Sequence, residues 1–187
     1  MVARGHDELA ALIALGRSTL DNGGIIPDTT PALRDRLFYS PQPLGPAGKI
    51  AFVFPGSGNH FAGIGMELFS RWPGILRRQD RENLLLRAQF QPESFWNGAP
   101  AALINDDHRA VIFGQVAIGC AVSDLVRLFA VNPAAVIGYS LGETAGLFAL
   151  RAWCDRDGMY TRMQESTLFT HDLAGECRAA QRAWGLA

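Results

Sequence analysis

A serine stands between two glycines in the stretch Gly138-Tyr139-Ser140-Leu141-Gly142. The β-branched residues Val136 and Ile137 precede it, and a segment rich in alanine and leucine follows it. This order predicts a strand, a sharp turn and a helix. Such an arrangement is a nucleophile elbow, in which the serine oxygen is exposed and the flanking glycines avoid Cβ clashes. The amides at the start of the helix would stabilise a negatively charged oxygen beside Ser140.

A glycine-rich loop follows the apolar run of residues 49–54, which is typical of a buried strand in a parallel sheet. The loop reads Pro55-Gly56-Ser57-Gly58-Asn59-His60. Its Ser57 can supply one backbone N–H of an oxyanion hole, and Leu141, the residue after the nucleophile, can supply the other. A plain turn between a strand and a helix is the alternative interpretation.

A serine hydroxyl is a weak nucleophile near neutral pH and needs a general base. The sequence offers His6, His60, His108 and His171. We interpret His108 and His171 as surface side chains, because the first lies in the opening turn of an expected helix and no convincing strand separates the second from Ser140. We expect His60 to line the site. Whether His60 is also the general base is left open.

The rest of the chain is expected to be mostly helical. Helices are predicted over residues 7–20, with Asp7 as N-cap, and over residues 63–72, 74–88, 105–129, 141–153, 155–169 and 172–184. Asp106 or Asp107 could cap the longest of them. Together with the two apolar strands, this predicts a helix-rich α/β fold, part of a hydrolase-like three-layer domain with short parallel strands and a nucleophile elbow.

Composition sets the class of protein. Among the 187 residues, 48% are apolar and 19% are charged, which is typical of a globular protein. Seventeen basic side chains balance eighteen acidic ones, so no nucleic-acid surface is expected. Three widely spaced cysteines predict buried thiols in a reducing compartment. With no signal peptide and no long uninterrupted apolar run, we expect a cytoplasmic protein with no membrane segment and no metal site.

Two motifs resemble the acyltransferase domain of type I polyketide synthases, polyunsaturated fatty acid synthases and the related malonyl-CoA:acyl carrier protein transacylases. Residues 52–60 resemble that family's Phe-Pro-Gly-Gln-Gly-Ser-Gln loop, and residues 138–143 resemble its Gly-His-Ser-x-Gly-Glu elbow. The resemblance covers residues 48–153. It makes residues 48–187 the N-terminal part of an acyltransferase domain and residues 1–47 similar to the linker that joins a ketosynthase to an acyltransferase.

The resemblance implies a serine-linked acyl-enzyme. Ser140 would accept an acyl group from acyl-CoA, commonly malonyl-CoA, and pass it to the phosphopantetheine thiol of an acyl carrier protein. The amides of Ser57 and Leu141 would form the oxyanion hole. The expected partners are the carrier protein and neighbouring ketosynthase domains, and no bound cofactor is expected. The substrate site is expected to include Gly56, Gly58, His60, Tyr139 and Arg162.

This sequence departs from the family at several of these positions. Ser57 and His60 stand where the family has glutamines, and Tyr139 replaces its histidine. The family's carboxylate-binding arginine aligns with Glu165, so Arg162, one turn earlier on the same helix face, is the substitute candidate. Without a cation there, a malonyl group loses its bidentate partner, and an uncharged acyl group is favoured.

The family's catalytic histidine lies beyond a ferredoxin-like subdomain inserted after residue 170. The general base is therefore expected beyond Ala187, and the chain alone is expected to be nearly inactive. An exposed sheet edge is expected to be covered by a missing C-terminal half or by self-association. Two alternatives remain. One is a serine hydrolase such as a thioesterase, and the other is a non-catalytic structural piece of a megasynthase.

Overall fold

The computed structural model describes residues 1–26, 35–96, 108–173 and 175–186. The chain divides into two compact units, Met1–Gly48 and Lys49–Ala187, beside the boundary that the sequence places near Gly48. Each unit is described by itself below.

The first unit contains helix α1 (His6–Asp21) and the short 3-10 helix η1 (Gly45–Ala47). Arg36 contacts the N-terminal part of this unit: its backbone carbonyl accepts from the Val2 N–H at 2.9 Å, and its guanidinium lies 3.0 Å from the Glu8 carboxylate. The prediction of Asp7 as N-cap was wrong, because α1 begins one residue earlier and Asp7 lies inside its first turn. Part of the proline-rich stretch, residues 27–34, lies outside the described residues.

A two-stranded parallel sheet opens the second unit. Strand β1 (Ala51–Phe54) pairs with β2 (Ala135–Gly138) in a register that sets Ala51 opposite Ala135 and Phe54 opposite Gly138. The strands are parallel, so both carboxyl ends meet at one edge, and the loops that follow them start side by side. The side chains of Val53 and Ile137 are 72% and 59% exposed on the sheet. The short parallel sheet and the helix-rich α/β character are as predicted.

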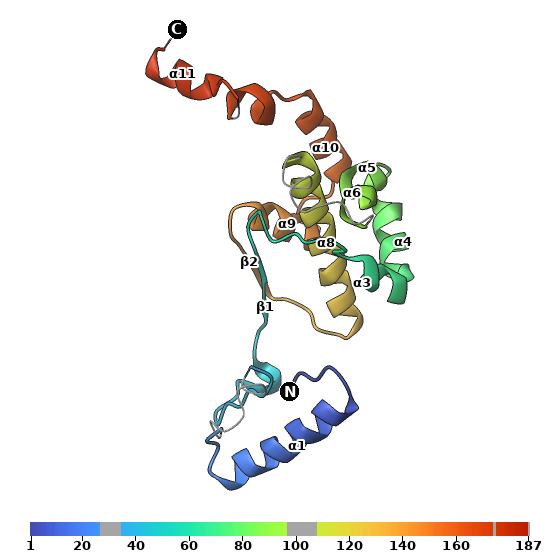
Figure 1. Cartoon of the computed structure of the whole chain (residues 1–187), viewed down its shortest axis with the longest axis vertical. Coiled ribbons are helices and arrows are strands. Elements are labelled where there is room, and N and C mark those ends of the chain that lie inside the picture. The colour runs from blue at the N-terminus through green and yellow to red at the C-terminus, as the bar shows by residue number, and fades with distance from the viewer. Residues whose placement is uncertain (27–34, 97–107, 174, 187) are drawn as a thin grey trace. The chain divides into compact units, whose positions relative to one another are not determined.

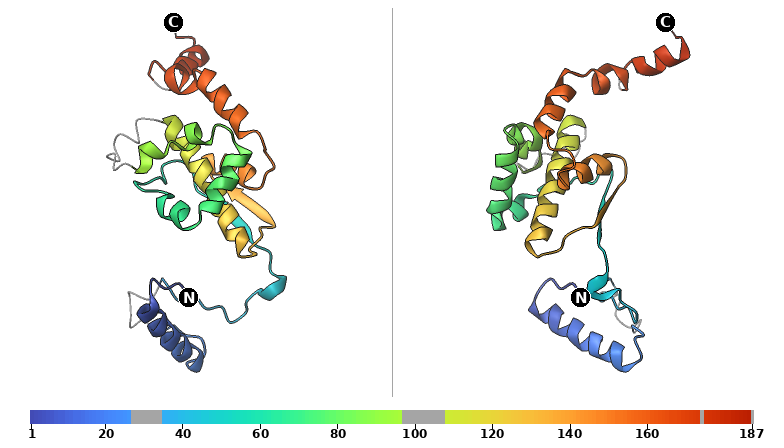
Figure 2. Two further views of the ribbon diagram at one scale, coloured as in Figure 1. Left: turned by 90° about the vertical axis from the view of Figure 1, so that its right-hand side faces the viewer. Right: turned by 180° about the vertical axis from the view of Figure 1, so that it is seen from behind.

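Helix α8 (His108–Leu128) is the centre of this unit. On one side it packs against α9 (Leu141–Ala149), which also contacts both strands. On the other side it packs against α4 (Pro73–Glu82) and α5 (Leu86–Phe90), and α3 (Met66–Arg71) contacts α4. Figure 1 shows α8 between the strands on one side and α3, α4 and α5 on the other, and the right-hand view of Figure 2 shows the same order from behind. The predicted helix over residues 74–88 is thus two helices.

Two apolar clusters form the core on either side of α8. One lies under the sheet and contains Phe54, Val116, Cys120, Ala145, Phe148 and Ala149. The other is rich in aromatic rings and includes Phe69, Phe90 and Phe95. Helix α6 (Pro92–Trp96), which the sequence reading missed, contributes Phe95 to this cluster, and its Trp96 indole donates to the Ile64 carbonyl at 2.8 Å.

The C-terminal segment is broken where the sequence suggested longer helices. Helix α10 (Arg156–Glu165) is capped by Asp155, whose carboxylate accepts from the Gly158 N–H at 2.7 Å. The prediction of one helix through residue 169 was wrong, because α10 ends at Glu165 and a π-helical turn, η2 (Leu168–Asp172), follows. Helix α11 (Arg178–Trp184) begins six residues later than predicted and is joined to η2 by an ion pair between Arg182 and Asp172.

Cysteine burial differs from expectation at two of the three positions. Cys120 is buried in α8 as predicted, but Cys154 and Cys177 are exposed and lie outside the helices.

Helix α8 is long and apolar enough, by length and composition, to cross a membrane. Half of its most apolar window is buried inside the protein, and core helices of water-soluble proteins pass the same test.

Candidate functional site

Ser140 lies at the joint between β2 and α9 in an unusual backbone conformation. Its φ is 53° and its ψ is −117°, and its side chain is exposed. This combination lies outside the left-handed helical region, and such sparsely populated conformations cost of order 1–3 kcal/mol and cluster at functional sites. The turn is closed by the Gly142 N–H, which donates to the Tyr139 carbonyl at 2.9 Å, and by the Glu143 N–H, which donates to the Ser140 carbonyl at 3.0 Å.

The glycines on either side of Ser140 allow backbone segments to touch. A Cβ on Gly138 would lie 2.2 Å from the Glu143 backbone nitrogen. A Cβ on Gly142 would lie 2.2 Å from the Phe54 carbonyl oxygen, in the strand opposite. The glycines of the motif are therefore required because the start of α9 lies directly against its own strand and against the end of β1.

The loop after β1 is held by a side chain from α8. Gln115 accepts from the Gly58 N–H at 2.9 Å and donates to the Gly56 carbonyl at 3.0 Å. The Asn59 side chain donates to the same Gly56 carbonyl at 3.0 Å. Gly58 has a φ of 92°, a conformation that glycine adopts without strain. Both peptide groups that flank Ser57 are therefore engaged by Gln115.

The two backbone amides predicted to form an oxyanion hole are both available. No hydrogen bond within the described part of the chain uses the backbone N–H of Ser57 or of Leu141. Leu141 is the first residue of α9, so its N–H is one of those that a helix leaves without an internal partner. Both residues face the same cavity.

That cavity, called here the serine pocket, has a volume of about 420 Å³. Ser140, Leu141 and Ser57 line it together with His108 and four apolar side chains, which are Val111, Ile112, Phe169 and Leu173. His108, Val111 and Ile112 lie at the start of α8. Phe169 lies in η2, and Leu173 follows η2 directly. The pocket therefore combines serine hydroxyls and an imidazole with an apolar wall.

The other residues predicted for the site lie around the pocket. Tyr139 is exposed, and its ring covers the place where a Gly56 Cβ would stand. His60 is half-buried, and its ring meets Phe95 edge to face with centroids 6.3 Å apart. Arg162 is exposed on α10. Neither His60 nor Arg162 is among the described residues that line the serine pocket, and their roles in substrate binding stay predictions.

Sequence reasoning missed two residues of this site. His108 is exposed as expected, but it lines the serine pocket. Gln115 was not considered, although a long polar side chain between Gly114 and Val116, in an otherwise apolar stretch of helix, was a usable signal. Neither position is close to Ser140 in sequence, so only the packing of α8 against the two loops brings them there.

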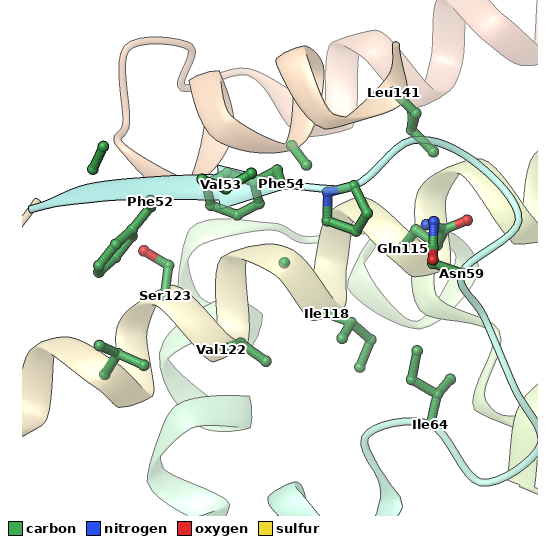
Figure 3. A pocket seen from close by; sticks show the side chains of 15 residues that line it. Phe52, Val53, Phe54, Asn59, Ile64, Gln115, Ile118, Val122, Ser123 and Leu141 are labelled. Atoms are coloured by element: carbon green, nitrogen blue, oxygen red, sulfur yellow. The ribbon is translucent and has the colours of Figure 1, made fainter. Parts of the chain in front are cut away.

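A second, more apolar cavity adjoins the loop on the side of β1. Its volume is about 540 Å³, and its wall is formed mainly by Phe52, Phe54, Ile64, Ile118, Val122, Val126 and Leu141. Figure 3 shows Gln115 and Asn59 together at the end of this cavity, next to the loop that leaves β1. Leu141 lines both cavities, so the start of α9 lies between them.

A buried polar network lies away from the serine pocket and joins α4, α5, α8 and α10. It consists of Gln79, Gln89, Asp124, Arg151, Arg156 and Asp157. Asp124, with no exposed surface, accepts from Gln79 at 2.6 Å and from Arg151 at 2.8 Å. Arg156 donates to Gln89 at 2.6 Å and to Gln79 at 3.0 Å.

This network contains side chains whose pKa values are displaced. Burial raises the pKa of the Cys120 thiol, which lies beside it, and burial lowers the pKa of the Arg156 guanidinium. A cavity of about 260 Å³ touches Cys120, Arg151 and Arg156. Within the described residues no group of three or more histidine, cysteine, aspartate or glutamate side chains is placed to hold a metal ion.

Comparison with known proteins finds relatives in the family that the sequence resembles. The chain is homologous to polyketide synthases and to a malonyl-CoA–acyl carrier protein transacylase, which confirms the predicted resemblance. No protein-family model matches the chain, and no solved structure matches it significantly.

Among the relatives is the atrochrysone carboxylic acid synthase of Aspergillus fumigatus, 34% identical over 153 residues, which are 79% of this chain and 8% of the synthase. A conidial pigment polyketide synthase of Pestalotiopsis fici is 28% identical over 86% of the chain and 7% of its own length. The malonyl-CoA–acyl carrier protein transacylase of Bacillus subtilis is 29% identical over 60% of the chain and 35% of its own length. The chain thus spans a small part of the synthases and about a third of the transacylase.

Proposed function

We propose that this chain carries the acyl-accepting serine of an acyltransferase in polyketide or fatty acid synthesis. The observation that carries the proposal is the placement of Ser140, strained at the start of α9, in one pocket with Ser57 and two unused backbone N–H groups. We infer that this joint is a nucleophile elbow and that the sheet belongs to a hydrolase-like three-layer domain. Its relatives, which include a malonyl-CoA–acyl carrier protein transacylase, support the reaction class.

The proposed reaction has two halves. In the first, the Ser140 Oγ attacks the thioester carbonyl of an acyl-CoA, its proton passes to a general base, and the carbonyl oxygen becomes an oxyanion. The N–H groups of Ser57 and Leu141 donate to that oxyanion, and its collapse breaks the C–S bond and releases coenzyme A as a thiol. In the second, the phosphopantetheine thiol of a carrier protein attacks the ester and restores the serine hydroxyl.

The residues that line the pocket suggest a general base and a place for the acyl chain. His108 is the described histidine that lines it, so it is our candidate to accept the Ser140 proton. The apolar wall of Val111, Ile112, Phe169 and Leu173 suits the carbon chain of an acyl group. We propose malonyl-CoA or a related acyl-CoA as the donor, an acyl carrier protein and a ketosynthase as cytoplasmic partners, and no bound cofactor.

The proposal is tested by intact-mass spectrometry of the chain after long incubation with malonyl-CoA or butyryl-CoA. We expect one acyl group on the wild type, located at Ser140 by peptide mapping, and none on Ser140→Ala. Ser57→Ala is the matched control, because it removes a neighbouring hydroxyl but keeps the backbone N–H, so its labelling should equal that of the wild type. Label retained on Ser140→Ala, or absent from the wild type, would refute the acyl-enzyme.

The same experiment separates the alternative activity. Addition of holo acyl carrier protein to the labelled chain should move the acyl group to the carrier protein, which gains its mass. Release of free acid at an equal rate with and without carrier protein would indicate a serine hydrolase instead.

A further inference from the structure

Gln115 is placed to control the shape of the loop that supplies the Ser57 amide. Its side-chain oxygen accepts from the Gly58 N–H at 2.9 Å, and its side-chain nitrogen donates to the Gly56 carbonyl at 3.0 Å. Ser57 is the residue between these two peptide groups. A side-chain amide is suited to this task because it presents one acceptor and one donor side by side. No other orientation of the amide matches both partners.

The hydrogen bond to the Gly56 carbonyl fixes the direction of the Ser57 N–H, because the two groups belong to one planar peptide unit. With the Gly56 carbonyl and the Gly58 N–H turned toward α8, the Ser57 N–H has no partner within the described residues, and Ser57 lines the serine pocket. The loop is also restrained from the opposite side, since a Cβ on Gly56 would meet the Tyr139 ring at 2.8 Å and the Tyr139 carbonyl at 3.1 Å. Gln115 and the Ser140 turn therefore hold the loop between them.

The helix that carries Gln115 gives this contact its rigidity. Neighbouring residues of α8 on both sides of Gln115 are buried, including Phe113, Gly114 and Val116. The side chain itself is half-buried, and Figure 3 shows it at the end of the apolar cavity beside Asn59. The bond to the Gly56 carbonyl is partly buried, and a hydrogen bond in such a setting costs more to leave unmade than one in water, whereas the bond from the Gly58 N–H is exposed.

We propose that Gln115 is a positioning residue for acyl transfer, which sets the Ser57 N–H toward the oxyanion without touching the substrate. This inference rests on the acyl-transfer function proposed above. Removal of one oxyanion donor typically costs on the order of a hundredfold in rate, and misplacement by about 1 Å costs a similar factor. A loop that has lost Gln115 should therefore acylate Ser140 about tenfold to a hundredfold more slowly.

The test compares Gln115→Met, which keeps the size but loses both hydrogen bonds, with Gln115→Glu, which can still accept from the Gly58 N–H. Gln89→Met is the matched control, because Gln89 is a buried glutamine of the polar network. Ser140 labelling by malonyl-CoA and butyryl-CoA is measured against donor concentration. We expect Gln115→Met to lower the maximal rate with an unchanged half-saturating concentration, Gln115→Glu to fall between, and Gln89→Met to label normally per folded molecule.

A second readout separates failure of this inference from failure of the acyl-transfer proposal. Hydrogen exchange at the Gly58 amide, followed by NMR, needs no activity, and we expect it to be faster in Gln115→Met than in the wild type. If the wild type is not labelled at Ser140, acyl transfer is refuted, but faster exchange still supports the loop contact. Wild-type labelling rates in Gln115→Met, or unchanged exchange at Gly58, would overturn the positioning role.

Discussion

The serine pocket and the buried polar network are built in opposite ways. At the pocket the reactive side chain is exposed, its backbone is strained, and the restraint comes from backbone close to backbone at Gly138 and Gly142. In the network Asp124 and Arg156 are buried, and the restraint comes from side chains, since Asp124 is ion-paired with Arg151 and Arg156 donates to Gln89. Burial displaces the pKa of Arg156 in the network and that of Cys120 beside it. A displaced pKa therefore marks structure rather than chemistry in this part of the molecule.

The two regions should therefore respond to different measurements, the network to unfolding and the serine pocket to acylation. Changes in the network should alter stability and leave the rate of Ser140 acylation per folded molecule unaltered. Changes at Ser140 and in the turn that holds it should alter acylation, and glycine at position 140 should give a more stable protein than alanine there. Four predictions examine this division, in order of decreasing effect.

Asp124→Ala should be the most damaging change to stability. It removes a fully buried carboxylate, so the Gln79 side-chain nitrogen loses its acceptor and the Arg151 guanidinium keeps only Glu82 and the Ala149 carbonyl. Breaking a buried ion pair in this way costs about 3–5 kcal/mol. Urea unfolding measures the loss, and the exposed Asp80→Ala on α4 is the control. A loss no larger than that of Asp80→Ala would show that the network does not hold the helices together.

Gly142→Ala should affect both stability and acylation. Its Cβ would lie 2.2 Å from the Phe54 carbonyl oxygen, so the start of α9 must move away from β1. Overpacking of this kind costs about 1–3 kcal/mol, and the displaced Leu141 N–H should reduce Ser140 labelling. Gly74→Ala is the control, because nothing lies within 4 Å of its Cβ. Normal labelling of a folded Gly142→Ala would contradict the proposed oxyanion hole.

Ser140→Gly should abolish acylation and yet increase stability relative to Ser140→Ala. Both variants lack the hydroxyl, but only glycine adopts a φ of 53° with a ψ of −117° without strain. The difference in unfolding free energy should be about 1 kcal/mol in favour of glycine. Equal midpoints in thermal unfolding of the two variants would mean that the turn at Ser140 is not strained.

Cys120 should resist alkylation while the other two thiols react. Burial raises the pKa of Cys120, so its thiolate form is scarcer at any given pH than that of an ordinary thiol, and the reactive thiolate appears only at higher pH. Cys154 and Cys177 are exposed. Iodoacetamide at pH 8, read by mass spectrometry, should add two groups to the folded chain and three in urea. A third group on the folded chain would place Cys120 in contact with solvent.

Much of the site could be predicted from local sequence. The pattern around Ser140 specified a strand, a turn and a helix because glycines appear where a Cβ would strike backbone, and the structure has these elements in these places. The run before Gly56 likewise predicted β1 and its loop. These are properties of a few consecutive residues, which steric limits on the backbone decide.

Other features could not be read from neighbours in sequence. The break between α10 and η2 and the separate helix α6 depend on what each segment packs against, which helix propensity alone does not decide. His108 and Gln115 became part of the site because α8 lies between the loops and the aromatic core. The sequence by itself determined the serine, its turn and its relatives. Only the tertiary structure decided which distant side chains surround that serine, because side-chain hydrogen bonds and packing join residues that are far apart along the chain.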